Sequence, residues 1–321
     1  METENLAVKP AAPESGQAAA RRGELPISIL ARARIAFVRG FLVCWSKLFS
    51  MSGLYLLGQV FGTLEYLIDY KRRRRVHAKL RSFFKDEYPP PWFRRTAWRY
   101  FMRVRCDKMF YTIMDRIPRG KLMNRIKMFG RENVDNALAR GNGVYIALCH
   151  FGAHHVAGLM TALSGYKVVG IRDPRESPVR RYIQNKYRET FPEVAGMEMF
   201  MASSFPRAVY RGFKENKLIA SLLDVDRSRG ENTKTHPVRF FGETREFLVG
   251  PIQIAVRCGA TTLQGFIESR KNFYYRLSAT PPLVDPQQVT DEEAMISDVL
   301  QRYADGVERF AREHPDHLMN I

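Results

Sequence analysis

The chain has 321 residues, of which 45% are hydrophobic and 12% aromatic, and its formal net charge is +18. Enough apolar residues are present to bury the core of one large domain, which excludes a wholly disordered chain. The four cysteines (Cys44, Cys106, Cys149 and Cys258) show no CxxC or metal-ligand spacing. So few cysteines argue against a secreted disulfide framework and favour a reducing cytoplasmic setting.

The positive charge is concentrated in the first part of the chain. Residues 1–130 contain 26 Lys and Arg against 10 Asp and Glu, a net charge of +16, which leaves +2 for residues 131–321. We expect the basic part to contact an anionic surface and the near-neutral part to hold the chemistry. Phospholipid, nucleic acid and an acidic carrier protein are the candidate partners.

Residues 1–24 have no apolar run that could form the core of a signal peptide, and their Ala, Pro, Glu and Gly content predicts a disordered lead. The run 48–64 then carries no charge for 17 residues, at the lower limit for crossing a bilayer. Basic residues flank it on both sides, so the positive-inside rule gives no orientation. We expect a helix lying in the membrane interface, with the KRRRR run at 71–75 on anionic headgroups. A buried core helix followed by solvated charges is the alternative.

From Arg94 to Ile117, apolar residues recur at helical spacing opposite a basic face, which predicts an amphipathic helix. Residues 25–130 are therefore interpreted as a basic helical, membrane-associated region. Beyond Gly130, apolar runs at 143–149, 166–171, 218–224 and 260–267 predict strands. Amphipathic stretches near 155–163, 178–190, 206–215, 247–257 and 291–313 predict helices. Alternating strands and helices indicate an α/β domain over 131–321, with a central mixed sheet flanked by helices.

His150 lies directly after a predicted buried strand and before a helix, in the sequence GVYIALCHFGAHHVAGLM. Reactive side chains of α/β folds commonly lie at such junctions, and neutral imidazole is suited to act as a base near pH 7. A structural histidine is the alternative at this stage.

Three segments in order resemble the bacterial lipid A lauroyl and myristoyl acyltransferase family. CHFGAHH (149–155) resembles the family's HFGNWE block, in which an acid stands five residues after the histidine. The segment 222–267 resembles a second block, with an Asp pair, a Gly-containing loop, FFG, GP and GA. VERFAREHPDHLM (307–319) resembles the closing helix, and the likeness covers roughly residues 35–319.

The resemblance implies that a fatty acyl group passes from a thioester, usually on acyl carrier protein, to a hydroxyl of a membrane lipid such as a lipid A precursor or another glycolipid. It places the reaction at the cytoplasmic face of the cell inner membrane, within lipopolysaccharide or related lipid biosynthesis. His150 would be the catalytic base, and no metal or organic cofactor is required. Nucleic acid is not an expected partner, because no nucleic-acid-binding signature accompanies the charge.

The chain departs from the family pattern at position 155, where His155 stands in place of the acid. A carboxylate partner fixes the tautomer of a catalytic histidine and stabilises its imidazolium form. Three interpretations remain open. His155 substitutes as a neutral acceptor and is itself a catalytic residue, an acid such as Asp224 or Asp226 reaches His150, or the protein binds lipid or acyl carrier protein without turnover.

Four residues are candidates for binding substrate. Asp224 and Asp226 end a predicted strand, where aspartates also serve as turn and capping residues. Arg172 follows the second predicted strand, and Arg245 follows the FFG sequence. A planar guanidinium suits a lipid phosphate. A zinc site at His150, His154 and His155 is the weaker hypothesis, because no fourth ligand stands at suitable spacing.

Overall fold

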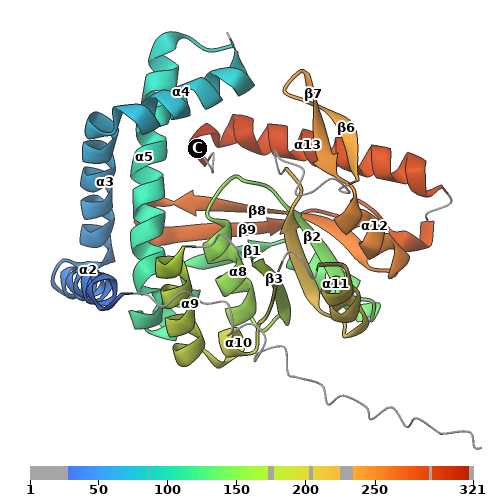
Figure 1. The fold of residues 1–321 in the computed structure, drawn as a ribbon, viewed down its shortest axis with the longest axis horizontal. Helices are drawn as coiled ribbons and strands as arrows, with labels where there is room; N and C mark the ends of the chain where they lie inside the picture. The colour runs from blue at the N-terminus through green and yellow to red at the C-terminus, as the bar shows by residue number, and fades with distance from the viewer. Residues whose placement is uncertain are drawn as a thin grey trace, which may run out of the picture.

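A computed structural model of the chain describes residues 28–85, 87–172, 177–201, 205–224, 234–288 and 291–317. The predicted disordered lead at 1–24 lies outside these residues. The described part has an α/β fold in which helices cover a central mixed sheet, which confirms the predicted fold class (Figure 1).

The central sheet has seven strands in the order β1-β9-β8-β2-β5-β3-β4. Their bounds are β1 (Ile126–Phe129), β2 (Val144–Leu148), β3 (Val168–Arg172), β4 (Glu198–Met201), β5 (Leu218–Leu222), β8 (Thr261–Arg270) and β9 (Tyr274–Ala279). β2 pairs in parallel with both β5 and β8, whereas β9 pairs antiparallel with β8. A separate antiparallel hairpin joins β6 (Thr235–Phe240) to β7 (Glu243–Leu248). The boundary predicted at residue 130 stays a prediction; β1 precedes it and pairs with β9.

Helices precede the sheet and then alternate with its strands. The first group is α2 (Ile29–Leu48), α3 (Ser50–Ile68), α4 (Tyr70–Phe84), α5 (Pro90–Ile113), η1 (Met114–Arg116), α6 (Arg119–Met123) and α7 (Arg131–Ala139). The second is α8 (His154–Leu163), α9 (Pro178–Thr190), α10 (Pro192–Ala195), α11 (Phe205–Lys214), α12 (Gly250–Arg257), η3 (Lys271–Phe273), η4 (Pro286–Gln288), α13 (Glu292–Glu313) and η5 (Pro315–His317).

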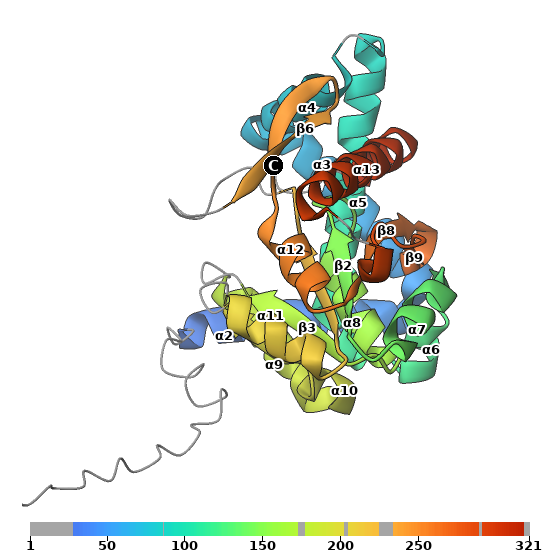
Figure 2. The ribbon, with the colours of Figure 1, turned by 90° about the vertical axis from the view of Figure 1, so that its right-hand side faces the viewer.

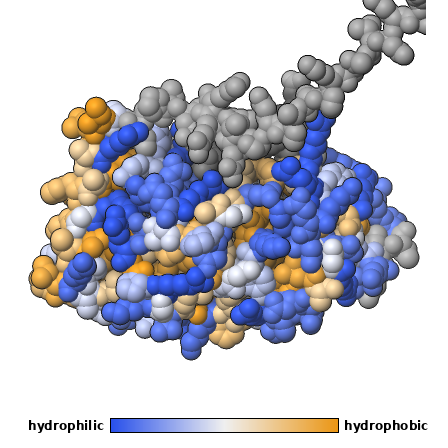
Figure 3. Space-filling view, turned by 90° about the horizontal axis from the view of Figure 1, so that it is seen from below, coloured by the Kyte–Doolittle hydropathy of each residue, from blue (hydrophilic) through white to orange (hydrophobic). Residues whose placement is uncertain are grey.

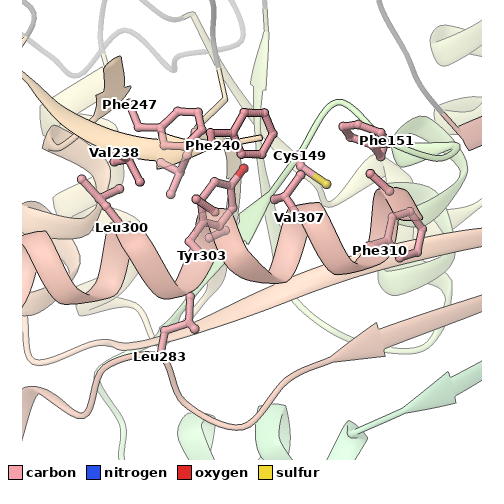
Figure 4. Packing of buried hydrophobic residues seen from close by; sticks show 14 of the residues in the cluster. Cys149, Phe151, Val238, Phe240, Phe247, Leu283, Leu300, Tyr303, Val307 and Phe310 are labelled. Atoms are coloured by element: carbon pink, nitrogen blue, oxygen red, sulfur yellow. The ribbon is translucent and has the colours of Figure 1, made fainter. Parts of the chain in front are cut away.

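Strand β2 is buried on both faces because helices lie on each side of the sheet. Successive side chains of a strand point to opposite faces, so Tyr145 and Ala147 join the hydrophobic cluster that contains Tyr303 of α13. Val144 and Ile146 belong instead to the cluster on the α8 side. Figure 4 shows the first cluster along α13, where aromatic residues of the hairpin lie above the helix. A continuous apolar run is the sequence pattern expected of such a strand.

Helix α4 is joined to the sheet region by aromatic packing. Phe83 lies 4.7 Å from Phe241, 5.9 Å from Phe240 and 6.2 Å from Phe151, measured between ring centroids. Figure 2 shows the resulting arrangement, with α4, β6 and α13 close together at the top of the molecule. The loop that follows β2 therefore lies beneath α4.

Helix α3 contains most of the predicted apolar run and is two-sided. Leu54, Gly58 and Gly62 face α5 and are buried. The outer side exposes a stripe of apolar side chains: Leu56, Val60, Phe61, Leu64, Leu67 and Ile68. Figure 3 shows hydrophobic residues gathered at the left of the molecule, where Figure 1 places α2 and α3. In the described ranges, no helix combines the length and apolar character needed to cross a membrane.

Close approach of α3 to α5 depends on glycine, which gives a testable prediction. A Cβ built on Gly62 would lie 2.4 Å from the Met102 Cα, so Gly62→Ala forces the two helices apart. We expect a loss of about 1–3 kcal/mol of stability, as overpacking typically costs. The matched control is Gly40→Ala on α2, where nothing lies within 4 Å and alanine favours the helix by up to about 1 kcal/mol. Denaturant unfolding measures both, and equal effects would contradict the packing argument.

Candidate active site

His150 and Asp224 are brought together by the register of two parallel strands. Leu148, the last residue of β2, pairs with Leu222, the last residue of β5. The ladder continues one step further, because the Leu223 N–H donates to the Leu148 carbonyl at 3.2 Å. Two residues beyond each strand end, His150 and Asp224 therefore face each other at the carboxyl edge of the sheet, where α/β folds commonly bind ligands.

Asp224 holds His150 at two points. Its Oδ1 lies 3.0 Å from the His150 Nδ1, and its Oδ2 accepts a hydrogen bond of 2.7 Å from the His150 backbone N–H. The side chains are largely buried, with 20% of His150 and 10% of Asp224 exposed. A carboxylate at Nδ1 favours the tautomer with its proton there, which leaves Nε2 with a free lone pair. Of the open interpretations, the structure has the geometry in which Asp224 reaches His150.

Two titratable groups next to this pair, His154 and Cys149, are neutral. Burial is the main reason why the pKa of His154 is lowered to about 3, with the nearby His150 and Arg180 as further causes. Burial likewise raises the pKa of the Cys149 thiol well above its usual value, and Asp224 adds to that shift. His154 is therefore uncharged at neutral pH, and Cys149 remains a protonated thiol.

His155 stands at the position of the family's acid, but its side chain contacts residues of α9 and α5. It contacts Arg180 of α9, and its ring lies 5.9 Å from that of Tyr111 on α5. Among the described residues, no hydrogen bond joins it to His150. The catalytic role of His155 stays a prediction. Its contacts in the structure are those of a residue that positions Arg180.

A cavity of about 90 Å³ lies between α8 and the sheet, and its lining includes Cys149 and Phe151, the residues on either side of His150. Phe151 and His154 lie at the end nearest His150. The walls are mostly apolar and come from six strands, α7 and α8; they include Ile146, Leu148, Phe266, Ile267, Leu277, Ala157 and Gly158. The apolar lining suits part of a hydrocarbon chain.

The three other residues predicted to bind substrate are Arg172, Asp226 and Arg245. Arg172 ends β3, and Asp226 lies outside the described residues. Arg245 is on β7, with its guanidinium carbon 5.1 Å from the centre of the Phe83 ring and 5.6 Å from that of Phe240. Because Phe83 packs on Phe151, Arg245 belongs to the wall above the His150 loop. Each remains a proposed contact for substrate.

The His150 loop has a support that sequence reasoning missed. Gly152 has φ +76°, and a Cβ there would lie 2.1 Å from the Ile267 carbonyl oxygen, so only glycine fits. Its N–H donates to the His317 carbonyl at 2.6 Å, and His317 Nε2 accepts from the Ser269 N–H at 2.9 Å. The segment EHPDH at 313–317 thus fastens the loop to the end of β8. In the sequence, the resemblance of this segment to the family's closing helix is the signal that could have indicated this contact.

Comparison with known proteins identifies the family of this chain. The family described as bacterial lipid A biosynthesis acyltransferase matches residues 35–321. This chain belongs to that family. The match includes His150, Asp224 and the C-terminal turn that supports the loop.

Two curated proteins are similar to part of this chain. Two phosphatidylinositol mannoside acyltransferases, from two strains of Mycobacterium tuberculosis, are each 31% identical over 140 residues. Each match covers 42% of this chain and 41% of the relative, so the chain aligns with less than half the length of these proteins.

The lowered pKa of His154 predicts a pH effect on folding. In the folded protein the pKa of His154 is about 3, whereas in the unfolded chain the same histidine takes a proton near pH 6.5. This residue therefore costs increasing stability as the pH falls below about 6.5. We expect His154→Gln to gain melting temperature relative to the wild type as the pH is lowered from 7 to 4. Parallel curves of melting temperature against pH would contradict the assignment.

Proposed function

We propose that this protein transfers a fatty acyl group from a thioester to a hydroxyl group of a membrane glycolipid. The observation that carries the proposal is the His150–Asp224 pair at the carboxyl edge of the sheet, in a chain that belongs to an acyltransferase family. Acyl transfer to a hydroxyl needs a base, since an alcohol is a weak nucleophile at neutral pH.

In the proposed reaction, Asp224 holds the His150 Nδ1–H while Nε2 takes the proton of the acceptor hydroxyl. The hydroxyl oxygen attacks the thioester carbonyl and forms a C–O bond. The C–S bond then breaks, and the imidazolium returns its proton to the leaving thiolate. The products are an ester and a free thiol, and the step uses no metal, redox agent or organic cofactor.

The apolar cavity beside His150 is the proposed site of the acyl chain. Its lining suits methylene groups, and because Cys149 and Phe151 line it, a chain bound there would have its thioester carbonyl near His150. A neutral His154 favours this arrangement, because a charged group would be costly in apolar surroundings. At about 90 Å³ the cavity is small for a long chain, so such a chain must part the lining side chains.

Acyl carrier protein is the proposed donor, and α4 is the part of the chain that suits an acidic carrier. This helix contains seven Lys or Arg residues and no Asp or Glu. Lys71, Arg74, Arg75 and Arg81 are exposed. The buried side of the same helix presents Phe83 to the loop after His150. A carrier bound to the basic side would therefore lie near the proposed site.

An anionic membrane is the proposed location, at the cytoplasmic face of the inner membrane. Helices α2 and α3 expose apolar side chains, including Phe37, Phe41, Leu56 and Val60, and basic residues such as Arg34 lie among them. Apolar insertion combined with headgroup attraction is the way in which interfacial helices bind. The matched relatives are named for a phosphatidylinositol mannoside, and the family for lipid A, which supports a glycolipid as the acceptor.

The proposal predicts that His150 and Asp224 act as a unit. With carrier-bound and coenzyme A thioesters and a panel of membrane lipids, the wild type should form lipid product. His150→Ala should lower kcat by at least about 10²-fold, because a general base contributes 10² to 10⁴. Asp224→Asn keeps the shape but loses the charge, and should have an effect at least as large as about 10²-fold. Asp298→Asn, on an exposed part of α13, is the matched control.

The substitution His155→Glu tests whether Asp224 or an acid at position 155 is the partner of His150. Because His155 contacts Arg180, the glutamate should pair with that guanidinium and leave turnover within several-fold of the wild type. A large rise in activity would instead favour the family's acid position as the partner of His150. Wild-type protein that binds carrier or lipid without forming product would support a noncatalytic relative.

If α3 contacts the membrane, a charge placed on its outer side should weaken membrane binding more than the same charge placed elsewhere. Val60→Asp should release the protein from phosphatidylglycerol vesicles in a flotation assay, since a carboxylate resists burial among acyl chains. Val179→Asp on α9 is a close control, because Val60 is 48% exposed and Val179 is 44% exposed. High salt should weaken wild-type binding without abolishing it. Equal release of both variants would count against α3 as the contact.

A further inference from the structure

A second and larger cavity is lined by His317, whose carbonyl supports the His150 loop. It is a cleft of about 620 Å³ between α3, α5, the end of β8 and the C-terminal turn η5. Its lining includes Tyr55 and Gln59 of α3, Arg99 of α5, Glu268 and Arg270 of β8, and Tyr274 of β9. Neither the acyl chain nor the carrier occupies it in the proposed reaction.

Charged groups of both signs line the cleft and several are paired with one another, so no single sign of charge dominates. Arg270 Nε lies 2.9 Å from Glu268 Oε1, and the Arg99 Nε lies 4.0 Å from Asp316 Oδ2. Beside these pairs stand the Gln59 amide and the half-exposed ring of Tyr274. Fixed donors and acceptors with an aromatic surface suit a neutral polyhydroxyl ligand better than a bare anion.

The cleft also borders the surface proposed to contact lipid. Tyr55 and Gln59 line it, and their neighbours Leu56 and Val60 point outward with 61% and 48% of their surface exposed. A lipid whose hydrocarbon tails lie beside the outer face of α3 would therefore have its headgroup at the opening of the cleft. The site suits an amphiphile rather than a free sugar.

The cleft is close enough to His150 for one ligand to reach both. His317 lines the cleft, and its carbonyl accepts a hydrogen bond of 2.6 Å from the Gly152 N–H. Two residues of extended chain span at most about 7 Å, so His150 is within roughly 10 Å of that carbonyl. A headgroup of two or three sugar rings is longer than this separation.

The direction of the imidazole supports the same path. Asp224 follows β5, whereas the cleft borders β8, and these strands pair with opposite edges of β2. With Nδ1 turned to Asp224, Nε2 is directed away from the β5 side. A hydroxyl that approaches from the β8 side therefore meets the free nitrogen.

We propose that the cleft between α3, α5, β8 and the C-terminal turn binds the sugar headgroup of the acceptor lipid and directs one of its hydroxyls to His150. This inference rests on the proposed acyl transfer and adds the location and chemical class of the acceptor site. Gln59 and Tyr274 are the residues assigned to headgroup recognition, and neither takes part in the proton transfer.

Binding is tested apart from turnover in a His150→Ala background. The probes are vesicles of phosphatidylcholine with and without a diacyl lipid that bears a two-hexose headgroup. We expect the glycolipid to strengthen binding, and Tyr274→Ala with Gln59→Ala to remove that gain by about 10-fold or more. Tyr210→Ala, at a tyrosine 37% exposed on α11, should leave the gain unchanged. Equal binding by the double variant and the control would overturn the proposal, whatever the catalytic activity.

The same substitutions are then tested in the active enzyme. The double variant should raise KM for the glycolipid by about 10-fold, while hydrolysis of the thioester by water in the absence of acceptor stays at the wild-type rate. A parallel loss of hydrolysis would assign the residues to the fold or the donor site and overturn the proposal. If inorganic phosphate or phosphatidic acid displaces the glycolipid from the cleft, the site recognises anions and the proposal is wrong.

Discussion

The parallel pairing of β2 with β5 is the constraint on which the candidate site depends. Matched strand ends place His150 opposite Asp224, and the carboxylate then fixes both the backbone and the ring of the histidine. A shift of one residue in this register would turn one of the two side chains to the other face of the sheet. Hydrophobic burial on both faces of β2 opposes such a shift. The packing of the core therefore also maintains the geometry of the site.

The sequence predicted the interior strands and left out those at the margins. β2, β3 and β5 are mainly apolar runs, which is the pattern of strands covered on both faces, whereas in β8 the polar Thr261, Thr262 and Gln264 are buried among apolar residues. β1, β6, β7 and β9 mix apolar and charged residues, for example Lys127, Arg239, Arg245 and Arg276, and β4 is only four residues long. Helices α8, α9, α11, α12 and α13 agree with prediction to within a few residues at each end. For α12 the first predicted residues belong to β7.

For the site, the sequence identified the residues but not their relation. His150 and Asp224 were each singled out, yet 74 positions separate them, and only the strand order brings them together. The family motif leaves His155, or an acid such as Asp224, as the possible partner of His150; in the structure Asp224 contacts His150, and His155 contacts Arg180. The support of the loop by His317 could not be read from spacing, since that contact joins the last helical turn to the middle of the chain.

The placement of the cysteines has a practical consequence. Cys106 and Cys149 are buried and Cys258 is half-buried, whereas Cys44 is exposed on α2. On the helix, Cys44 shares its face with Phe37, Phe41 and Leu48, which are also exposed. After Cys258→Ser, a thiol-linked fluorophore would sit at one defined point among these apolar side chains. Its emission colour would then follow, in real time, whether that face is in water or in lipid.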